Sequence, residues 1–321
     1  MENARRLPKP PRLIIAFGPF ASVFSDEILL SGLADIVVKD DPEFVIPAVL
    51  EGRSPLKSVP NISYRHEGTI IHTVKHSFPN LDEIPFIGPY FYNQGHPRAF
   101  LMTARGCQHH CVFCDRNVHW GGGLRYRSVA NVLDEVRDLV ENNQAGEIEL
   151  LDEDFAADQK RLTAICAGMR RIKGQFFWAC SACVSSVNKK MLFLMGRSAC
   201  REIYFGVESA SPAVLHRLGK RYSRQDILNA VRWSQEAGLK VEVMITVDNP
   251  GETEQDRNLT LSALKELGPD VKVSTNRLVI LPGTALYREG LRKGWFTRQS
   301  FFEDEGLVFY GDKRQEAAYG R

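Results

Sequence analysis

Three cysteines that lie close together in the chain have the spacing of an iron–sulfur ligand set. Cys107, Cys111 and Cys114 form the pattern C-x3-C-x2-C, directly after a short apolar run, Ala99 to Met102. Three thiolates on one loop can bind three irons of a [4Fe–4S] cluster and leave the fourth iron open to a small molecule. The spacing therefore indicates a metal centre with one free coordination position.

Two other interpretations of this motif remain open. Structural zinc binds four ligands, so His109 or His110 would have to fold back within the same tight loop to complete the set. The spacing could also arise by chance among core cysteines, because short thiol motifs are hypotheses until their structural context agrees.

The elements that would position this loop alternate between strands and helices, a pattern typical of a parallel sheet covered by helices. Apolar residues recur on one side of Val129–Val140 and of Gln225–Ala237, as expected for helices on a core. The expected strands are Phe100–Ala104, Glu147–Leu151, Phe176–Cys180, Glu202–Gly206, Lys240–Val247 and Val271–Leu281. Six such units predict an α/β fold with a partial (β/α)6 TIM-like barrel, whose ligand groups gather at the C-terminal strand ends.

The cysteine loop resembles that of the radical S-adenosylmethionine (SAM) superfamily, including Phe113 before the last cysteine. The resemblance extends from about Phe100 to Glu289 and is closest to the group whose members often carry an N-terminal cobalamin-binding domain. It implies that the open iron binds the amino and carboxylate groups of SAM. It also implies reductive cleavage to methionine and a 5′-deoxyadenosyl radical, which takes hydrogen from a substrate carbon. The protein would supply binding, orientation and exclusion of water.

An acidic stretch follows the second expected strand, Asp152-Glu153-Asp154-Phe155. Acidic groups buried at a sheet edge need a cation or several hydrogen-bond donors. The stretch resembles the family's Asp-Asp-x-Phe pattern, which implies that Asp152 or Asp154 contacts the methionine amine or the substrate. The alternative is that Asp154 caps the next helix, a common position for aspartate.

Two further stretches supply cofactor-binding candidates through the same resemblance. Phe205-Gly-Val-Glu-Ser209 resembles the family's Gly-Val-Glu-Ser motif, in which Gly206 would let the cofactor approach the backbone. Glu208 would accept hydrogen bonds from the ribose hydroxyls or the amine. Lys220 stands in the family's Gly-Lys turn and would bind the SAM carboxylate; a solvated surface lysine is the alternative.

The segments after the fifth and sixth expected strands also resemble family turns. Asn249-Pro-Gly-Glu-Thr253 resembles Gly-x-Pro-Gly-Glu-Thr, which adds Pro250 and Gly251 to the cofactor-binding candidates. Asp248 stands where the family usually has glycine, so we expect a less close approach to the ligand there. Leu281-Pro-Gly-Thr284 matches the family's Pro-Gly-Thr turn and would shape the wall of the adenosyl pocket.

A second cysteine pair, Cys180 and Cys183, has the spacing C-x-x-C. Such a pair could be two buried structural thiols, could contact the substrate or quench a radical, or could bind an extra cluster. No other C-x-x-C lies downstream to complete a four-thiolate site. Cys166 and Cys200 fit core positions, where free cysteine is often buried.

Residues 1–95 predict a small α/β unit: strands at Leu13–Phe17 and Asp35–Lys39, a helix at Asp26–Ser31, another from about Pro42 to Leu50, and a hairpin around Glu67-Gly68. Their order is similar to the last part of the family's cobalamin-binding domain and its linker, as a truncated Rossmann-like remnant. A capping unit without a ligand is the alternative.

Cobalamin is not expected in the histidine-ligated manner, because none of the eight histidines has an aspartate two residues before it. We expect residues 96–295 to form the barrel and 296–321 a C-terminal tail.

Bulk properties narrow the class of protein. The formal net charge of +2 requires neither nucleic acid nor a membrane surface as partner. No apolar run is long enough to span a bilayer, and Met1 to Arg12 lack a signal-peptide core. Seven cysteines without an export signal indicate reduced thiols in the cytoplasm.

The resemblance to the radical SAM superfamily implies an enzyme that abstracts hydrogen from a small organic substrate, such as a natural product. Rearrangement, epimerisation, dehydration or coupling would follow, with flavodoxin or ferredoxin as electron donor. Cobalamin-dependent methyl transfer is the alternative within the family, and a zinc-stabilised binding module is the alternative outside it. RNA modification, as in related methylthiotransferases, lacks the support of an appended RNA-binding domain or a dense basic stripe.

Overall fold

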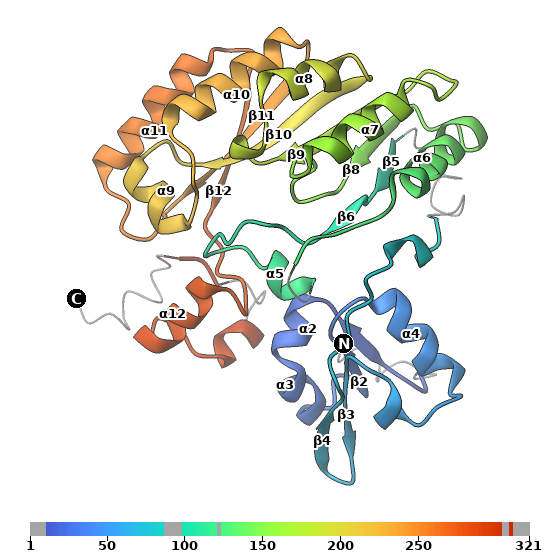
Figure 1. The fold of residues 1–321 in the computed structure, drawn as a ribbon. Helices are drawn as coiled ribbons and strands as arrows, with labels where there is room; N and C mark the ends of the chain where they lie inside the picture. The colour runs from blue at the N-terminus through green and yellow to red at the C-terminus, as the bar shows by residue number, and fades with distance from the viewer. Residues whose placement is uncertain (1–10, 87–97, 121–122, 304–307, 311–321) are drawn as a thin grey trace.

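The computed structural model describes residues 11–86, 98–120, 123–303 and 308–310. Its larger part is a six-stranded sheet in the order β12-β11-β10-β9-β8-β5, in which each neighbouring pair is parallel (Figure 1). The strands are β5 (Arg98–Leu101), β8 (Glu147–Leu150), β9 (Phe177–Ala182), β10 (Cys200–Glu208), β11 (Lys240–Val247) and β12 (Lys272–Arg277). The predicted partial barrel of six parallel strands is confirmed.

Two barrel strands end three or more residues earlier than the sequence predicted. The first strand ends at Leu101 rather than Ala104. The chain then turns away to form β6 (Ala104–Arg105), which pairs antiparallel with β7 (Arg125–Tyr126). The last strand ends at Arg277 rather than Leu281. Beyond it, Val279 forms an isolated bridge with Phe309, so the backbone groups there have a different partner.

Helices cover the outer face of the sheet (Figure 1). They are α6 (Val129–Arg137) with the π-helical turn Asp138–Asn142, α7 (Gln159–Met169), α8 (Lys189–Gly196), α10 (Arg224–Glu236) and α11 (Glu254–Leu267). Each begins at a residue whose side chain accepts a hydrogen bond from the first turn, such as Ser223 in the capping box of α10. Alternate strand residues, including Ile148, Phe205 and Val243, are buried against these helices. The opposite strand face therefore remains for polar and ligand-binding side chains.

The N-terminal unit is one mixed sheet in the order β1-β2-β3-β4. The strands are β1 (Ile15–Phe17), β2 (Ile36–Val38), β3 (Ile62–His66) and β4 (Thr69–His72), and the helices are α2 (Pro19–Val23), α3 (Ser25–Leu30) and α4 (Pro42–Glu51). The predicted hairpin turns at Glu67 and Gly68, both with positive φ, and β3 also pairs antiparallel with β2. The hairpin is thus part of the sheet rather than a separate linker.

The C-terminal segment packs against this N-terminal unit. Helix α12 (Ala285–Lys293) lies beside α2 and α3, and η6 (Gln299–Phe302) follows it (Figure 1). Phe301 and Phe296, which the sequence placed in a tail, join Phe24 and Tyr287 in one buried hydrophobic cluster. Residues 296–303 are therefore part of a core rather than a free tail, whereas 311–321 lie outside the described residues.

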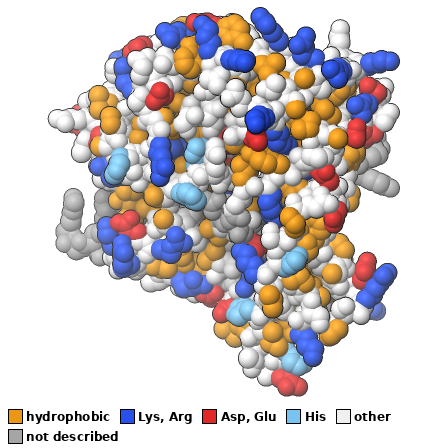
Figure 2. Space-filling model, in the orientation of Figure 1, with side chains coloured by type: hydrophobic (Ala, Val, Ile, Leu, Met, Phe, Trp, Pro, Cys, Tyr) orange, Lys and Arg blue, Asp and Glu red, His pale blue; other side chains and the backbone are white. Residues whose placement is uncertain are grey.

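On the face shown in Figure 2, Lys and Arg side chains are spread among hydrophobic, acidic and uncharged ones. Among the described helices, none combines the length and the apolar character needed to cross a membrane.

Candidate active site

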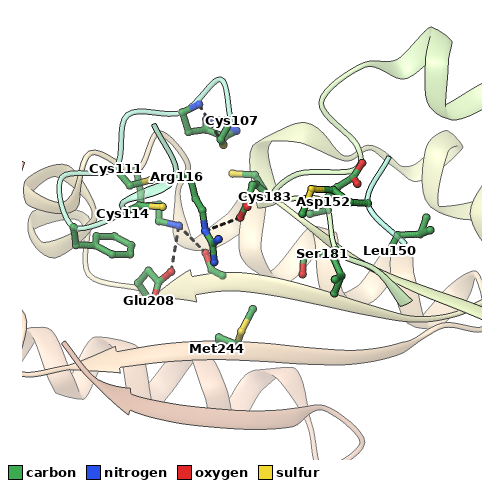
Figure 3. A pocket seen from close by; sticks show the side chains of 18 of the residues that line it. Cys107, Cys111, Cys114, Arg116, Leu150, Asp152, Ser181, Cys183, Glu208 and Met244 are labelled. Atoms are coloured by element: carbon green, nitrogen blue, oxygen red, sulfur yellow. Dashed lines mark hydrogen bonds and ion pairs between the residues drawn. The ribbon is translucent and has the colours of Figure 1, made fainter. Parts of the chain in front are cut away.

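Cys107, Cys111 and Cys114 line one cavity of about 530 Å³ at the C-terminal ends of the barrel strands (Figure 3). Burial raises the pKa of Cys107 to about 12 and also raises the pKa of Cys111 and Cys114. A thiol of this kind keeps its proton at neutral pH until a cation displaces it, since metal ligation requires the thiolate. The three sulfur atoms are thus available at one site.

A single zinc ion and an iron–sulfur cluster require different arrangements of the three cysteines. Among the described residues, no group of three or more His, Cys, Asp or Glu side chains could hold a single metal ion. A tetrahedral ion requires its ligands to converge on one point. A cluster instead offers each thiolate its own iron.

Two glycines allow the backbone to close around the cysteine loop. Gly106 has φ +89, and a Cβ atom there would lie 2.0 Å from the carbonyl oxygen of Gly123. Gly219, which ends α9 (Pro212–Leu218), has φ +77, and a Cβ atom there would lie 3.0 Å from the carbonyl oxygen of His110. Close backbone approach at both points explains why only glycine fits.

Asp154 anchors the cysteine loop to the neighbouring strand ends. Its carboxylate contacts His109 Nε2 at 3.1 Å and accepts hydrogen bonds from the Cys183 amide at 3.0 Å and the Ser186 hydroxyl. The hydrogen bond to Asp154 is the main cause that raises the pKa of His109 to about 10. The alternative of a helix cap is wrong, because Asp158 is the N-cap of α7.

Asp152 lines the cavity but is already hydrogen-bonded within the protein. Its carboxylate accepts bonds from the Thr103 amide at 2.6 Å, the Thr103 hydroxyl and the Ala104 amide at 3.1 Å. Burial raises the pKa of Asp152, and these donors partly offset that effect. A role of Asp152 or Asp154 toward the cofactor stays a prediction, because the donors named here engage both carboxylates.

Lys220 and Glu208 form a buried ion pair in the cavity that the three cluster thiols line. Lys220 Nζ lies 3.3 Å from Glu208 Oε1, donates to the carbonyl oxygen of Gly206 at 3.0 Å, and lies 5.6 Å from the centre of the Phe113 ring. The Lys220 side chain is only 10% exposed. The alternative of a solvated surface lysine is therefore wrong. Gly206, Glu208, Lys220 and Phe113 all line the cavity.

Glu208 is held in a backbone conformation that is uncommon for its residue type. Its φ is +60, and the register between β10 and β11 shifts between Gly206 and Glu208. The bulge turns the carboxylate toward Lys220, and the Thr246 hydroxyl donates to its second oxygen. Strain of this kind costs about 1–3 kcal/mol and clusters at ligand-binding sites.

The cavity has further lining residues that sequence reasoning did not assign. Arg116 follows the last cluster cysteine by two positions, and its Nε lies 3.0 Å from Glu153 Oε2. Ser181 and Met244 lie on the inner face of β9 and β11. Strand alternation could have indicated Ser181 and Met244, whereas nothing in the sequence marks the pairing of Arg116 with Glu153.

Pro250 and Gly251 lie elsewhere. They follow the end of β11 but are not among the residues that line the cavity. A Cβ atom at Gly251 would lie 3.6 Å from the Arg217 guanidinium carbon, so the loop packs beside that side chain. Their assignment to cofactor binding stays a prediction.

The second cysteine pair is divided between two environments. Cys180 is fully buried in the barrel core, as are Cys166 and Cys200, whereas Cys183 is partly exposed and lines the cavity. Burial acts to raise the pKa of Cys183, but hydrogen bonds with His109 and Ser185 outweigh it and lower the pKa. The extra-cluster interpretation has no support among the described residues, because Cys180 points into the core.

Comparison with known proteins identifies the family. Residues 101–264 match the model of the radical SAM superfamily. The chain belongs to this superfamily. It is also 31% identical over 265 residues to an uncharacterized methyltransferase, PH0819, from Pyrococcus horikoshii. That alignment covers 79% of this chain and 57% of the relative. A cytidylyl-2-hydroxyethylphosphonate methyltransferase from Streptomyces wedmorensis is 24% identical and covers 67% of this chain and 44% of the relative.

Solved radical SAM structures share the fold. The cobalamin-dependent radical enzyme OxsB, with aqua-cobalamin bound, has a TM-score of 0.78 at 19% identity. The matched region covers 93% of this chain and 51% of the OxsB chain. The methyltransferase TsrM from Kitasatospora setae has a TM-score of 0.74 at 18% identity. The matched region covers 88% of this chain and 58% of the TsrM chain. The chain thus spans about half the length of the proteins it matches. Membership of the family makes the chain an enzyme and implies a [4Fe–4S] cluster and SAM, which leaves the zinc-stabilised module without support.

Proposed function

We propose that Cys107, Cys111 and Cys114 hold a [4Fe–4S] cluster and that the chain uses SAM at this site to abstract hydrogen from a small organic substrate. The observation that carries the proposal is the placement of the three thiols and the Lys220–Glu208 pair around one cavity. When bound, the cluster supplies one-electron cleavage of SAM to methionine and a 5′-deoxyadenosyl radical. A low-potential donor protein such as flavodoxin or ferredoxin would provide the electron.

The cavity residues divide the binding of SAM between charged and apolar groups. The Lys220 ammonium attracts the SAM carboxylate, and the Glu208 carboxylate accepts from the amine or the ribose hydroxyls. The Phe113 ring lies beside Lys220 and keeps water from that side of the ion pair. A volume of about 530 Å³ lies within the usual range for a small-molecule pocket. Met244 and Ser181 would face the substrate from the floor of the barrel.

Removing the charges of this pair should weaken SAM binding without loss of the cluster. We expect Glu208→Gln and Lys220→Met each to lower the affinity for SAM roughly ten- to a hundredfold, since a charge-assisted contact contributes about 1.5–3 kcal/mol. Isothermal titration of the anaerobic protein measures the affinity, and the iron content checks the cluster.

A matched control removes an ion pair outside the cavity. Lys272 Nζ lies 2.8 Å from Glu242 Oε2 on neighbouring strands, and neither residue lines the cavity. Lys272→Met should leave the affinity unchanged. Unchanged affinity in both Glu208→Gln and Lys220→Met would place the SAM pocket elsewhere.

Cobalamin-dependent methyl transfer is the second candidate, and the comparisons favour it. The two curated relatives described above are named methyltransferases, and OxsB was solved with cobalamin bound. The likeness to OxsB covers 93% of this chain, which includes most of the N-terminal unit. None of the eight histidines has an aspartate two residues before it, which argues against cobalamin binding through a histidine ligand. Some cobalamin proteins bind without a histidine ligand, so this argument excludes only one mode of binding.

The products that the enzyme forms from SAM distinguish hydrogen abstraction from cobalamin-dependent methyl transfer. Hydrogen abstraction converts SAM to methionine and 5′-deoxyadenosine, whereas methyl transfer converts a further SAM to S-adenosylhomocysteine, so this last product distinguishes them. We expect 5′-deoxyadenosine as the main product of the anaerobic, dithionite-reduced protein, and no hydroxocobalamin in its gel-filtration peak. Stoichiometric co-elution of the corrin with this chain, together with S-adenosylhomocysteine formation, would make methyl transfer the leading function.

A further inference from the structure

One buried carboxylate of the N-terminal unit, Asp41, contacts both ends of the cluster loop. Arg105 and Arg125 are paired residues in the two-stranded β6–β7 ladder, and the segment between them carries all three cluster cysteines. Asp41 contacts both guanidinium groups. Its Oδ1 accepts from Arg105 Nη1 at 2.9 Å and from Arg125 Nη2 at 3.0 Å, and its Oδ2 accepts from Arg125 Nη1 at 2.8 Å.

All three side chains of this contact are buried or nearly so. The Asp41 side chain is 2% exposed, Arg105 6% and Arg125 12%. Glu43 accepts two further bonds from Arg105, at 3.0 and 2.5 Å, so two carboxylates meet two guanidinium groups. The Arg105 guanidinium also stacks 4.5 Å above the ring of Trp120, inside the loop segment.

The backbone at Asp41 supports a positional role. The residue precedes the first turn of α4 with φ 46, in the left-handed region, and its side chain makes no cap hydrogen bond to that helix. Aspartate tolerates this conformation at a cost that the surrounding contacts must offset. The carboxylate is therefore directed away from its own helix and toward the base of the cluster loop.

We infer that Asp41 is a positioning residue that holds together the two ends of the cluster loop, and that this contact is a function of the N-terminal unit. Without Asp41 the loop ends would lose the three hydrogen bonds that join Arg105 to Arg125 through one carboxylate. The two guanidinium groups would also repel each other, because Glu43, which contacts Arg105, would be the one carboxylate of the described residues left beside them. Within the described part of the chain, Arg125 would keep only the carbonyl oxygens of Phe78 and Trp120 as acceptors. The loop ends would separate, and the thiols would no longer stay in the geometry that a cluster requires. The inference rests on the proposed cluster at these cysteines.

The test measures how fast the cluster is lost. Asp41→Asn removes the charge, and the double variant Asp41→Asn with Arg125→Gln removes one charge of each sign, so that no unpaired buried charge is created. The control is Asp40→Asn, since Asp40 pairs at 3.2 Å with Lys75, whose side chain is 66% exposed. After anaerobic reconstitution, bleaching of the cluster absorbance by an iron chelator gives the rate of loss, and electron paramagnetic resonance reports the change on SAM addition.

We expect both Asp41 variants to lose the cluster at least tenfold faster than the wild type and the Asp40→Asn control, with a diminished spectral response to SAM. The double variant should match the control in far-ultraviolet circular dichroism and thermal unfolding, which separates a change of loop geometry from a loss of folding. If Asp41→Asn does not fold, the double variant decides. A double variant that keeps its cluster and SAM response like the control overturns this inference alone, whereas a wild-type protein that takes up no cluster overturns it together with the proposed function.

Discussion

Replacing Cys111 with alanine is expected to abolish SAM cleavage. The remaining thiols, Cys107 and Cys114, could hold only two irons of the cube, and the residues that line the cavity include no spare cysteine on the same loop. We expect brown colour and iron content to fall to those of unreconstituted protein, and 5′-deoxyadenosine formation to fall below detection. Iron and sulfide assays with product chromatography measure both effects.

Cys183→Ala is the matched control for this variant. Cys183 lines the same cavity from β9's end but lies outside the C-x3-C-x2-C motif. Its replacement should leave the iron content at the wild-type level. Full SAM cleavage by the Cys111→Ala protein, or equal iron loss in the Cys183→Ala protein, would contradict the ligand assignment.

The second large effect is expected from Gly106→Ala. The new Cβ atom would lie 2.0 Å from the carbonyl oxygen of Gly123, and real Cβ atoms do not approach backbone oxygens so closely. The φ of +89 at Gly106 adds strain for a residue with a side chain. The β6–β7 ladder would have to open, so we expect at least a tenfold loss of cluster loading under conditions that fully load the wild type.

Gly238→Ala separates the clash from the strain. Gly238 follows α10 with φ +80, but no atom lies within 4 Å of the position of its Cβ. This variant should lose about 1 kcal/mol of stability from backbone strain alone and keep its cluster. Thermal unfolding and iron content measure both variants. Equal cluster loading in Gly106→Ala and Gly238→Ala would show that the approach to Gly123 does not matter.

The barrel could be predicted from the sequence because its strands and helices have clear periodicities. Residues such as Ile148 and Val241 alternate with polar neighbours, and this alternation locates strands without tertiary information. The end of β5 could not be predicted, since the apolar run continues to Met102. Only the antiparallel pairing of Ala104 with Tyr126 shows that the chain has already left the main sheet.

The site was predictable where a local motif carries the chemistry, and not where the contact is long-range. The cysteine spacing and the stretch around Glu208 are visible in the sequence. The burial of Lys220, the positive φ of Glu208 and the contact between Asp41 and Arg105, 64 positions apart, arise only when distant segments meet. Charged residues have no sequence pattern that distinguishes a buried ion pair from a solvated one.

The most direct test of the central claim is electron paramagnetic resonance of the reconstituted, dithionite-reduced protein, recorded with and without SAM. If Cys107, Cys111 and Cys114 hold a cluster with one open iron, the wild type shows the signal of a reduced [4Fe–4S] cluster, and this signal changes when SAM binds that iron. The Glu208→Gln protein should show the same starting signal and require more SAM for the change. A wild-type protein that forms no such cluster, or a cluster signal that SAM leaves unaltered, would contradict the account.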